Sequence, residues 1–147
     1  MLAVGMNDSG RSMWTCPRCG RLFTGRNMWH SCVTLSVDDH LARVPPRVGE
    51  LYRGFESMVR GCGPVEVVPV KTYISFMVRV RFAFAIVQQR ALRLRLEMPR
   101  VIESPRIVKV KVYGTIAGNY LRILELDELD DELARWVGES YRHGSGG

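Results

Sequence analysis

The side chains best suited to chemistry stand near the start of the chain, in two short motifs. Cys16 and Cys19 are separated by two residues, a spacing that lets one turn bring both sulfurs to the same metal ion. His30 and Cys32 follow in a His-Ser-Cys motif, and residues two apart in an extended segment point to the same side. These side chains predict a Cys3His zinc site. Because four protein ligands leave no open position for water or substrate, we expect the zinc to be structural.

The identity of the fourth ligand has one alternative. Structural zinc sites close most often with a ligand pair separated by two to five residues, whereas His30 and Cys32 are separated by one. Cys62 is therefore a reserve ligand. A redox role for the Cys-Pro-Arg-Cys motif would require a thioredoxin-like βαβ context, which the surrounding sequence does not supply.

The hydrophobic pattern argues for a cytoplasmic protein without a membrane segment. Residues 1–13 lack the apolar run of a signal peptide, and no stretch approaches the roughly 18 to 20 apolar residues of a spanning helix. In the reducing cytoplasm, clustered cysteines are metal ligands more often than disulfides.

Basic and aromatic residues surround the metal motifs. Arg18, Arg21 and Arg26 lie in a stretch without an acidic residue between Ser9 and Cys32. The aromatic residues of this stretch are Trp14, Phe23 and Trp29. Two interpretations stay open: the loop grips nucleic acid through phosphate contacts and base stacking, or the aromatic rings form a small core while the arginines keep the segment soluble.

The charge of the remaining chain is unevenly distributed. The net charge is +6, and residues 61–113 hold ten Lys or Arg against three Asp or Glu, while residues 114–147 hold three against seven. A basic middle segment favours an anionic partner, either a nucleic acid or an acidic protein.

Apolar periodicity predicts the elements that carry these charges. Residues 47–60 have the spacing of one helical face, with Pro46 at the start and glycines at the end. An alternating pattern over residues 74–86 is too long for one strand, so we expect a tight turn at residues 79–81. Further strands are predicted at residues 92–96, 106–113 and 119–126, with Gly114 and Gly118 bounding a hairpin loop, and a final helix at residues 127–142.

Together these elements predict an α+β protein with an N-terminal zinc knuckle. Residues 1–13 form a flexible lead, residues 14–35 the knuckle, residues 36–143 the α+β domain, and residues 144–147 a disordered tail. The domain is expected to have two layers, with about five antiparallel strands and amphipathic helices on one face.

The predicted sheet has a second candidate binding surface. If the leucines of 92–96 and the valines of 108–112 face the helices, the intervening basic residues share the opposite face. They are Arg93, Arg95, Lys109 and Lys111, and Arg79 and Arg81 are expected nearby. The alternative is a solvated polar face. No aromatic pair of the kind used by RNA-recognition motifs is visible there, so base-specific recognition is not predicted.

An enzyme is the weaker interpretation. Glu66 and Lys71, on adjacent strands, are the best candidates for a catalytic or ligand-binding pocket, although an ordinary salt bridge is the stronger explanation of such a pair. The sequence contains no glycine-rich phosphate loop, nucleophile elbow or His-Glu-x-x-His motif.

Several short motifs resemble one family. They are Trp-x-Cys-Pro-x-Cys-Gly-Arg from Trp14, His-Ser-Cys at 30–32, Gly-Pro-Val-Glu-Val at 63–67, Pro-x-Lys-Thr at 69–72, Val-Arg-Phe-Ala at 80–83 and Ser-Pro-Arg at 104–106. They resemble the bacterial family named domain of unknown function fifty-six fifty-five, in members that carry a zinc-knuckle-like leader. The resemblance implies the order of elements and no activity.

The sequence therefore predicts a small non-enzymatic binding protein with structural Zn²⁺ and an anionic partner such as nucleic acid. Two alternatives remain: an enzyme or ligand-binding domain around Glu66 and Lys71, or a protein-interaction module whose knuckle recruits an acidic partner.

Overall fold

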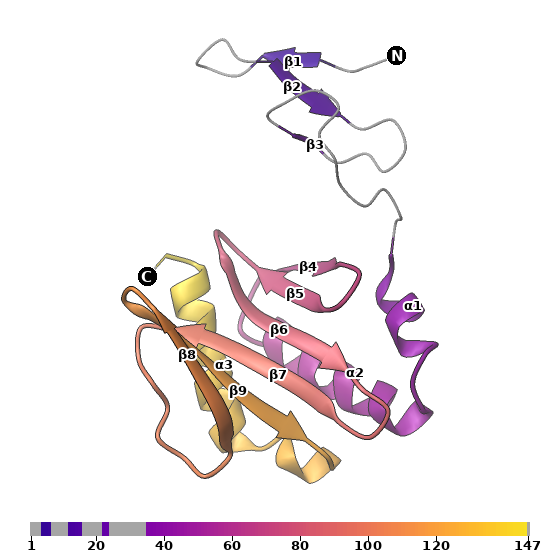
Figure 1. Cartoon of the computed structure of the whole chain (residues 1–147), viewed down its shortest axis with the longest axis vertical. Helices are drawn as coiled ribbons and strands as arrows, with labels where there is room; N and C mark the ends of the chain where they lie inside the picture. Colours follow the sequence, from indigo (N-terminus) through magenta and orange to yellow (C-terminus); the bar gives the residue numbers. More distant parts are fainter. Residues whose placement is uncertain (1–3, 7–11, 16–21, 24–34, 147) are drawn as a thin grey trace. The chain divides into compact units, whose positions relative to one another are not determined.

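The computed structural model describes residues 4–6, 12–15, 22–23 and 35–146 (Figure 1). The chain divides into two compact units, Met1–Thr34 and Leu35–Gly147. In the first unit, β1 (Val4–Met6), β2 (Ser12–Thr15) and β3 (Leu22–Phe23) form an antiparallel sheet in the order β1-β2-β3.

The second unit is an α+β domain built on a six-stranded antiparallel sheet. Its helical elements are α1 (Val37–Leu41), α2 (Pro46–Arg60), the 3-10 helix η1 (Leu126–Glu128) and α3 (Asp131–Gly144). Its strands are β4 (Glu66–Pro69), β5 (Ile74–Met77), β6 (Arg81–Val87), β7 (Leu92–Met98), β8 (Ile107–Tyr113) and β9 (Ile116–Ile123), in the order β4-β5-β6-β7-β9-β8.

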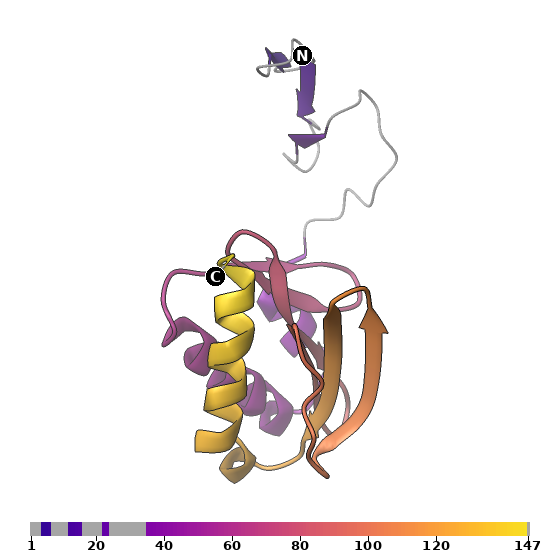
Figure 2. The ribbon, with the colours of Figure 1, turned by 90° about the vertical axis from the view of Figure 1, so that its left-hand side faces the viewer.

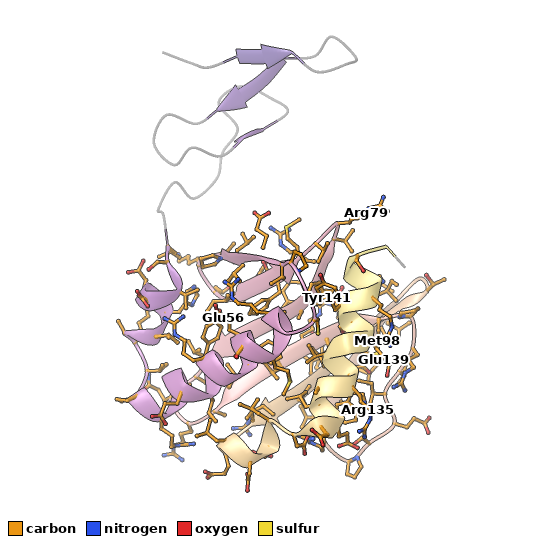
Figure 3. The ribbon with its side chains drawn as sticks, turned by 180° about the vertical axis from the view of Figure 1, so that it is seen from behind. Glu56, Arg79, Met98, Arg135, Glu139 and Tyr141 are labelled. Carbon is orange, nitrogen blue, oxygen red and sulfur yellow. The ribbon has the colours of Figure 1, made fainter. Side chains whose placement is uncertain are left out.

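The α+β class and the single helical layer are as predicted, but the strand count is one higher. The additional strand is β4, which pairs with β5 from Glu66 opposite Met77 to Pro69 opposite Ile74. α2 and α3 lie together on one face of the sheet, and neither covers the opposite face (Figure 2). From behind, both helices stand in front of the strands (Figure 3).

Local sequence signals begin and end the helices. Ser36 and Asp39 form a reciprocal capping box at the start of α1. Pro46 occupies the first position of α2, where its missing N–H removes no helical hydrogen bond. The Asp130 side chain accepts a hydrogen bond from the Leu133 amide and caps α3.

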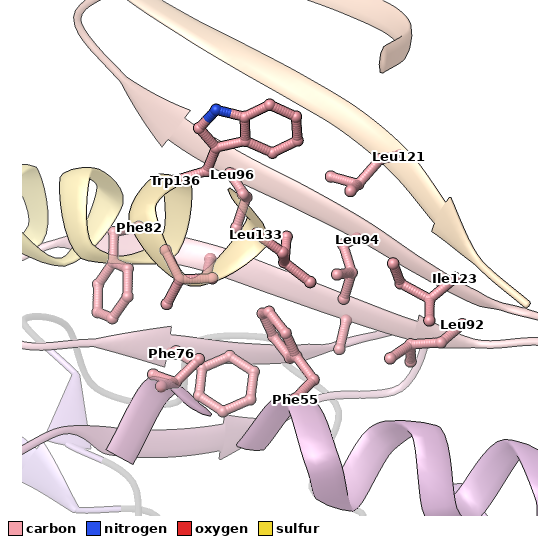
Figure 4. Close-up of a cluster of buried hydrophobic side chains, with 14 of the residues drawn as sticks. Phe55, Phe76, Phe82, Leu92, Leu94, Leu96, Leu121, Ile123, Leu133 and Trp136 are labelled. Atoms are coloured by element: carbon pink, nitrogen blue, oxygen red, sulfur yellow. The ribbon is translucent and has the colours of Figure 1, made fainter. Parts of the chain in front are cut away.

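The core lies between the sheet and the two long helices. Alternate residues of β7, namely Leu92, Leu94, Leu96 and Met98, are fully buried, which matches a strand with one face on the core. They pack with Phe55 of α2, Leu133 of α3 and the other side chains of one continuous cluster (Figure 4).

A bulge between β5 and β6 breaks the predicted alternation of residues 74–86. The chain turns between Met77 and Arg81, close to the expected position, but Phe76 pairs with Ala83 and Met77 with Arg81. Phe82 is the extra residue, and its ring is buried edge-on against Tyr141 with centroids 5.5 Å apart. As a result, the Phe82 side chain faces α3. Phe84, two residues later, lies on the opposite face of the sheet.

The hairpin joining β8 and β9 is tighter than predicted. Its turn is at Gly114, which has φ +62°, and β9 begins already at Ile116. Gly118 therefore lies inside a strand and does not bound the loop. A Cβ at Gly118 would lie 2.9 Å from Arg95 Nε, so this position needs glycine to admit the arginine.

β8 is an edge strand. Its valines are exposed and do not form part of the core, although the sequence pattern predicts that they face the helices. Val108, Val110 and Val112 are 59%, 37% and 59% exposed. A register shift between Ile107 and Lys109 places Val108 at an irregularity, and β8 is the outermost strand of the sheet.

Residues 144–147 were predicted to form a disordered tail, but the first of them still belongs to α3. Gly144 is the last residue of that helix and is buried, and its carbonyl accepts hydrogen bonds from the amides of Arg79 and Val80 at 2.9 and 3.1 Å. These bonds join the end of α3 to the turn between β5 and β6.

Candidate anion-binding face of the sheet

The sheet face opposite the helices carries a group of basic residues. Residues paired across strands point to the same face, and Arg95 pairs with Tyr120, which in turn pairs with Lys109. Arg93 pairs with Arg122 in the same ladder. The basic face is defined here as Arg81, Arg93, Arg95, Lys109, Lys111 and Arg122.

Three of these cations converge on one aromatic ring. Arg93, Arg95 and Lys109 place their charged groups 5.1, 5.4 and 5.2 Å from the centroid of the Tyr120 ring. Tyr120 is only 8% exposed, since these side chains cover it. Each cation is attracted by the face of the ring, whereas the three positive charges repel one another. The arrangement gathers three cations at the middle of the face, of which Arg95 is paired with Glu97 while Arg93 and Lys109 have no ion pair within residues 35–146.

Arg95 is held in place more firmly than its neighbours. Its guanidinium carbon lies 5.1 Å from the Phe84 ring centroid and 5.3 Å from that of Tyr113. Arg95 also forms an ion pair with Glu97, and the Tyr113 hydroxyl donates a 2.6 Å hydrogen bond to the same carboxylate. Gly118 stands opposite Glu97 and leaves the space that both side chains occupy. The guanidinium of Arg95 is therefore held in one orientation. Its Nε is buried and has no hydrogen-bond partner.

The other cations of the face are available to an external anion. Within residues 35–146, no carboxylate oxygen lies within 4.0 Å of the charged groups of Arg81, Arg93, Lys109, Lys111 or Arg122. Arg81 is positioned through its Nε, which donates to Ser75 Oγ at 3.1 Å, and Ser75 donates to the Val68 carbonyl at 3.0 Å. The remaining guanidinium donors of Arg81 face outward.

A shallow hollow of about 330 Å³ opens on this face. It is lined by Tyr73, Arg81, Phe84, Ile86, Arg95 and Tyr120. The rings of Tyr73 and Phe84 meet edge to face, with centroids 5.3 Å apart and an angle of 77° between their planes. The lining is therefore mainly apolar and aromatic, with Arg81 and Arg95 as its charged residues.

The structure brings together most of the residues predicted for the sheet surface. Arg93, Arg95, Lys109 and Lys111 share one face, and Arg81 lines the hollow beside Arg95. Arg79 does not join them. It lies beside the end of α3, where it lines a separate hollow with Val80, His143 and Gly146.

Three aromatic side chains lie on this face, although the sequence pattern indicates no aromatic pair of the kind used by RNA-recognition motifs. Phe84, Tyr113 and Tyr120 all contact Arg95 through their rings. The alternation of β9 could have placed Tyr120 on this face, because Leu121 and Ile123 are core residues and Tyr120 must then point away from the core. Phe84 had no such signal, since the bulge at Phe82 reverses its expected side.

Glu66 and Lys71 do not form a shared site. Glu66 begins β4, whereas Lys71 follows Pro69 at the other end of that strand, and a four-residue strand spans about 10 Å. Both side chains are exposed. The geometry offers this pair neither a salt bridge nor a common pocket.

The predicted metal ligands Cys16, Cys19, His30 and Cys32 lie outside the described residues, as do Arg18, Arg21 and Arg26. Within the described part of the chain, no group of three or more His, Cys, Asp or Glu side chains is arranged to hold a metal ion. Cys62 follows α2, where its Sγ donates to the Met58 carbonyl at 3.8 Å. Loss of hydration raises the pKa of the Cys62 thiol, which favours the protonated form.

The histidines of the second unit show no catalytic arrangement. His40 is buried, and its Nε2 lies 2.6 Å from the Val70 carbonyl, so a structural hydrogen bond accounts for it.

None of the described helices is both long and apolar enough to cross a bilayer.

Comparison with known proteins gives one match. Neither a curated protein nor a solved structure matches the chain. The model of one family covers residues 37–144, the whole of the α+β domain from α1 to α3, and it is the family that the sequence motifs resemble. The chain therefore belongs to the family described as Domain of unknown function (DUF5655).

Proposed function

We propose that this protein is a small non-enzymatic binding protein that docks nucleic acid on the basic face. The supporting observation is the convergence of Arg93, Arg95 and Lys109 on Tyr120. Gathering like charges costs free energy in the isolated protein, and a polyanion placed over them removes that cost. Phosphates neutralised by Lys and Arg release counterions, which drives the association.

Nucleic acid suits this face better than an acidic protein does. The cations are spread over neighbouring strands β7, β9 and β8, so that several phosphates of one backbone are contacted together. Tyr120 is covered, but Phe84 is partly exposed and Tyr113 is exposed, and such rings offer stacking surfaces that bases exploit and carboxylate side chains do not. An acidic protein partner remains one outcome of the test below.

The N-terminal segment contributes a structural zinc site in this proposal. Cys16, Cys19, His30 and Cys32 supply the four donors that a closed zinc site requires. Arg18, Arg21 and Arg26 are close to these ligands in the sequence, and they contribute phosphate contacts of their own in this proposal.

A filter-binding titration over a range of salt, with zinc present, tests the proposal. We expect retention of DNA or RNA at low salt and a linear fall of log affinity with log salt concentration. The double variant Lys109→Gln/Lys111→Gln should reduce the magnitude of that slope by roughly one to two, since each lost phosphate contact accounts for about 0.7 to 0.9.

The matched control removes the same charge elsewhere. Arg43→Gln/Arg135→Gln replaces two exposed cations outside the basic face, and Arg135 stands on the helical side (Figure 3). This control should leave the slope close to that of the wild type. Absence of retention at low salt would overturn the proposal, and capture of a polyglutamate probe instead would point to an acidic protein.

A further inference from the structure

The hollow beside Arg95 has the composition of a site for a flat aromatic group. Tyr73, Phe84 and Ile86 form its apolar lining, and Tyr120 closes it next to Arg95. Its volume of about 330 Å³ is at the lower end for ligand sites, which run from roughly 300 to 1,000 Å³. A site of this size has room for a base-sized ring.

The charged groups at the hollow add a second requirement. Arg81 lines the hollow, is exposed and is tethered to Ser75 through its Nε, and its other guanidinium donors have no side-chain partner within residues 35–146. Arg95 also lines the hollow, and its guanidinium is flanked by Phe84 and Tyr113 and paired with Glu97. An occupant with an aromatic ring and an attached anion matches both the aromatic and the cationic lining residues.

We propose that the hollow seats one unpaired base of a single-stranded nucleic acid, with its ring against Phe84 and its phosphate at Arg81. This inference rests on the proposed function and names its substrate class. A base inside a duplex is stacked and paired on both sides, so it cannot enter such a hollow without leaving the helix.

The rest of the basic face explains why the occupant is part of a polymer. Lys109, Lys111 and Arg122 lie on strands β8 and β9, beyond the residues that line the hollow. A base seated in the hollow leaves these cations to the neighbouring phosphates of the same strand. RNA and DNA share the ring and the phosphate that the site requires, so both are tested.

The experiment is a fluorescence anisotropy titration of the full chain, with zinc present. The probes are a labelled single-stranded RNA, the DNA strand of the same sequence and the DNA duplex, and unlabelled AMP and UMP serve as competitors. We expect both single strands to bind more tightly than the duplex, and the mononucleotides to compete only weakly.

Phe84→Leu tests the hollow directly, because it keeps an apolar side chain and removes the stacking surface. It should weaken single-strand binding by roughly five- to a hundredfold and change duplex binding little. Val101→Leu, at an exposed apolar residue that does not line the hollow, is the control and should change neither. If Phe84→Leu does not fold, Tyr73→Leu carries the same expectation, because Tyr73 forms the other half of the aromatic pair.

The outcomes separate this inference from the proposed function. Duplex binding equal to or tighter than single-strand binding overturns the base site and leaves nucleic-acid docking intact. Equal loss of single-strand and duplex affinity in Phe84→Leu also overturns the base site and leaves nucleic-acid docking intact. Mononucleotides that compete as well as the strand also overturn it, since the hollow is then a small-molecule site. No binding of any probe overturns both.

Discussion

Gly118 and Arg95 occupy complementary positions on neighbouring strands: a Cβ on Gly118 would lie 2.9 Å from Arg95 Nε and 3.3 Å from Glu97 Oε2. The arginine cannot move aside freely, because its guanidinium is flanked by aromatic rings and paired with Glu97. The glycine is therefore part of the architecture of the basic face.

Gly118→Ala should destabilise the protein by about 1 to 3 kcal/mol, since the added methyl group displaces Arg95 or bends β9. Urea denaturation measures the change. Gly49→Ala is the control: its nearest neighbour is Leu41 Cδ1 at 4.0 Å, and alanine in a helix is favoured by about 0.5 to 1 kcal/mol over glycine. A Gly118→Ala protein as stable as the wild type would show that Arg95 does not need this space.

Gly144→Ala should be more damaging than Gly54→Ala, although both glycines lie in helices. A Cβ at Gly144 would lie 2.7 Å from Phe82 Cγ and 2.9 Å from Phe82 Cβ, atoms close to the backbone that cannot rotate away. At Gly54 the nearest atom, at 2.5 Å, is Leu129 Cδ1, a terminal methyl group that can move. We expect a loss of about 1 to 3 kcal/mol for Gly144→Ala and a smaller loss for Gly54→Ala.

Thermal denaturation of the two variants makes this comparison. A double variant with Phe82→Ala supplies the check, because removing Cγ and the ring should make Gly144→Ala cost less than it does in the wild type. Independent, additive effects would contradict a direct clash between Phe82 and position 144.

Asp130 should make stability depend on pH in the acid range. The Leu133 amide and then the Arg106 guanidinium, 3.0 Å away, lower the pKa of Asp130 below its usual value of 3.8. A lowered folded-state pKa means that the unfolded chain binds the proton more readily. The stabilisation is therefore complete well above pH 3.8 and disappears as the pH falls through the folded-state pKa.

Asp130→Asn keeps an oxygen that can cap α3 and removes the charge. We expect a loss of roughly 0.5 to 1 kcal/mol near pH 7, which shrinks toward zero at strongly acid pH. Urea unfolding at several pH values measures it, with the exposed Asp127→Asn as the control. A difference between Asp130→Asn and the wild type that stays constant with pH would exclude the charge as its cause.

Zinc binding is expected to depend on the N-terminal motifs alone. Elemental analysis at equal protein concentration should find about one zinc per chain in the wild type and less in His30→Ala. His143→Ala should retain the metal, because that residue lies at the end of α3. Loss of zinc in Cys62→Ser, together with full retention in His30→Ala, would instead identify Cys62 as the fourth ligand.

Periodicity was sufficient to predict the elements that bury one regular face. Helix α2 has Leu51, Phe55 and Val59 four residues apart, and all three are buried. β7 alternates without interruption, so its leucines and its arginines were assigned to the correct sides. In each case neighbouring residues along the chain determine the pattern, and no distant contact alters it.

Irregular positions could not be predicted in this way. Phe82 and Ala83 are consecutive and both buried, because the bulge opposite Met77 inserts one residue into the strand. Gly118 resembles a turn residue from its sequence, but it lies within β9. Glycine is needed there because Arg95 occupies the space above it. A bulge and a close approach depend on the partner strand, which local sequence does not contain.

The alternation of Arg93 and Arg95 with leucines is enough to predict that both arginines lie on the face away from the core. The residues that surround them depend on which strands are neighbours in the folded sheet. β9 lies between β7 and β8, so Tyr120 stands between Arg95 and Lys109, and the bulge turns Phe84 toward the same face. Strand order and register are set by packing across the whole sheet, and they convert a row of charges into a basic and aromatic surface.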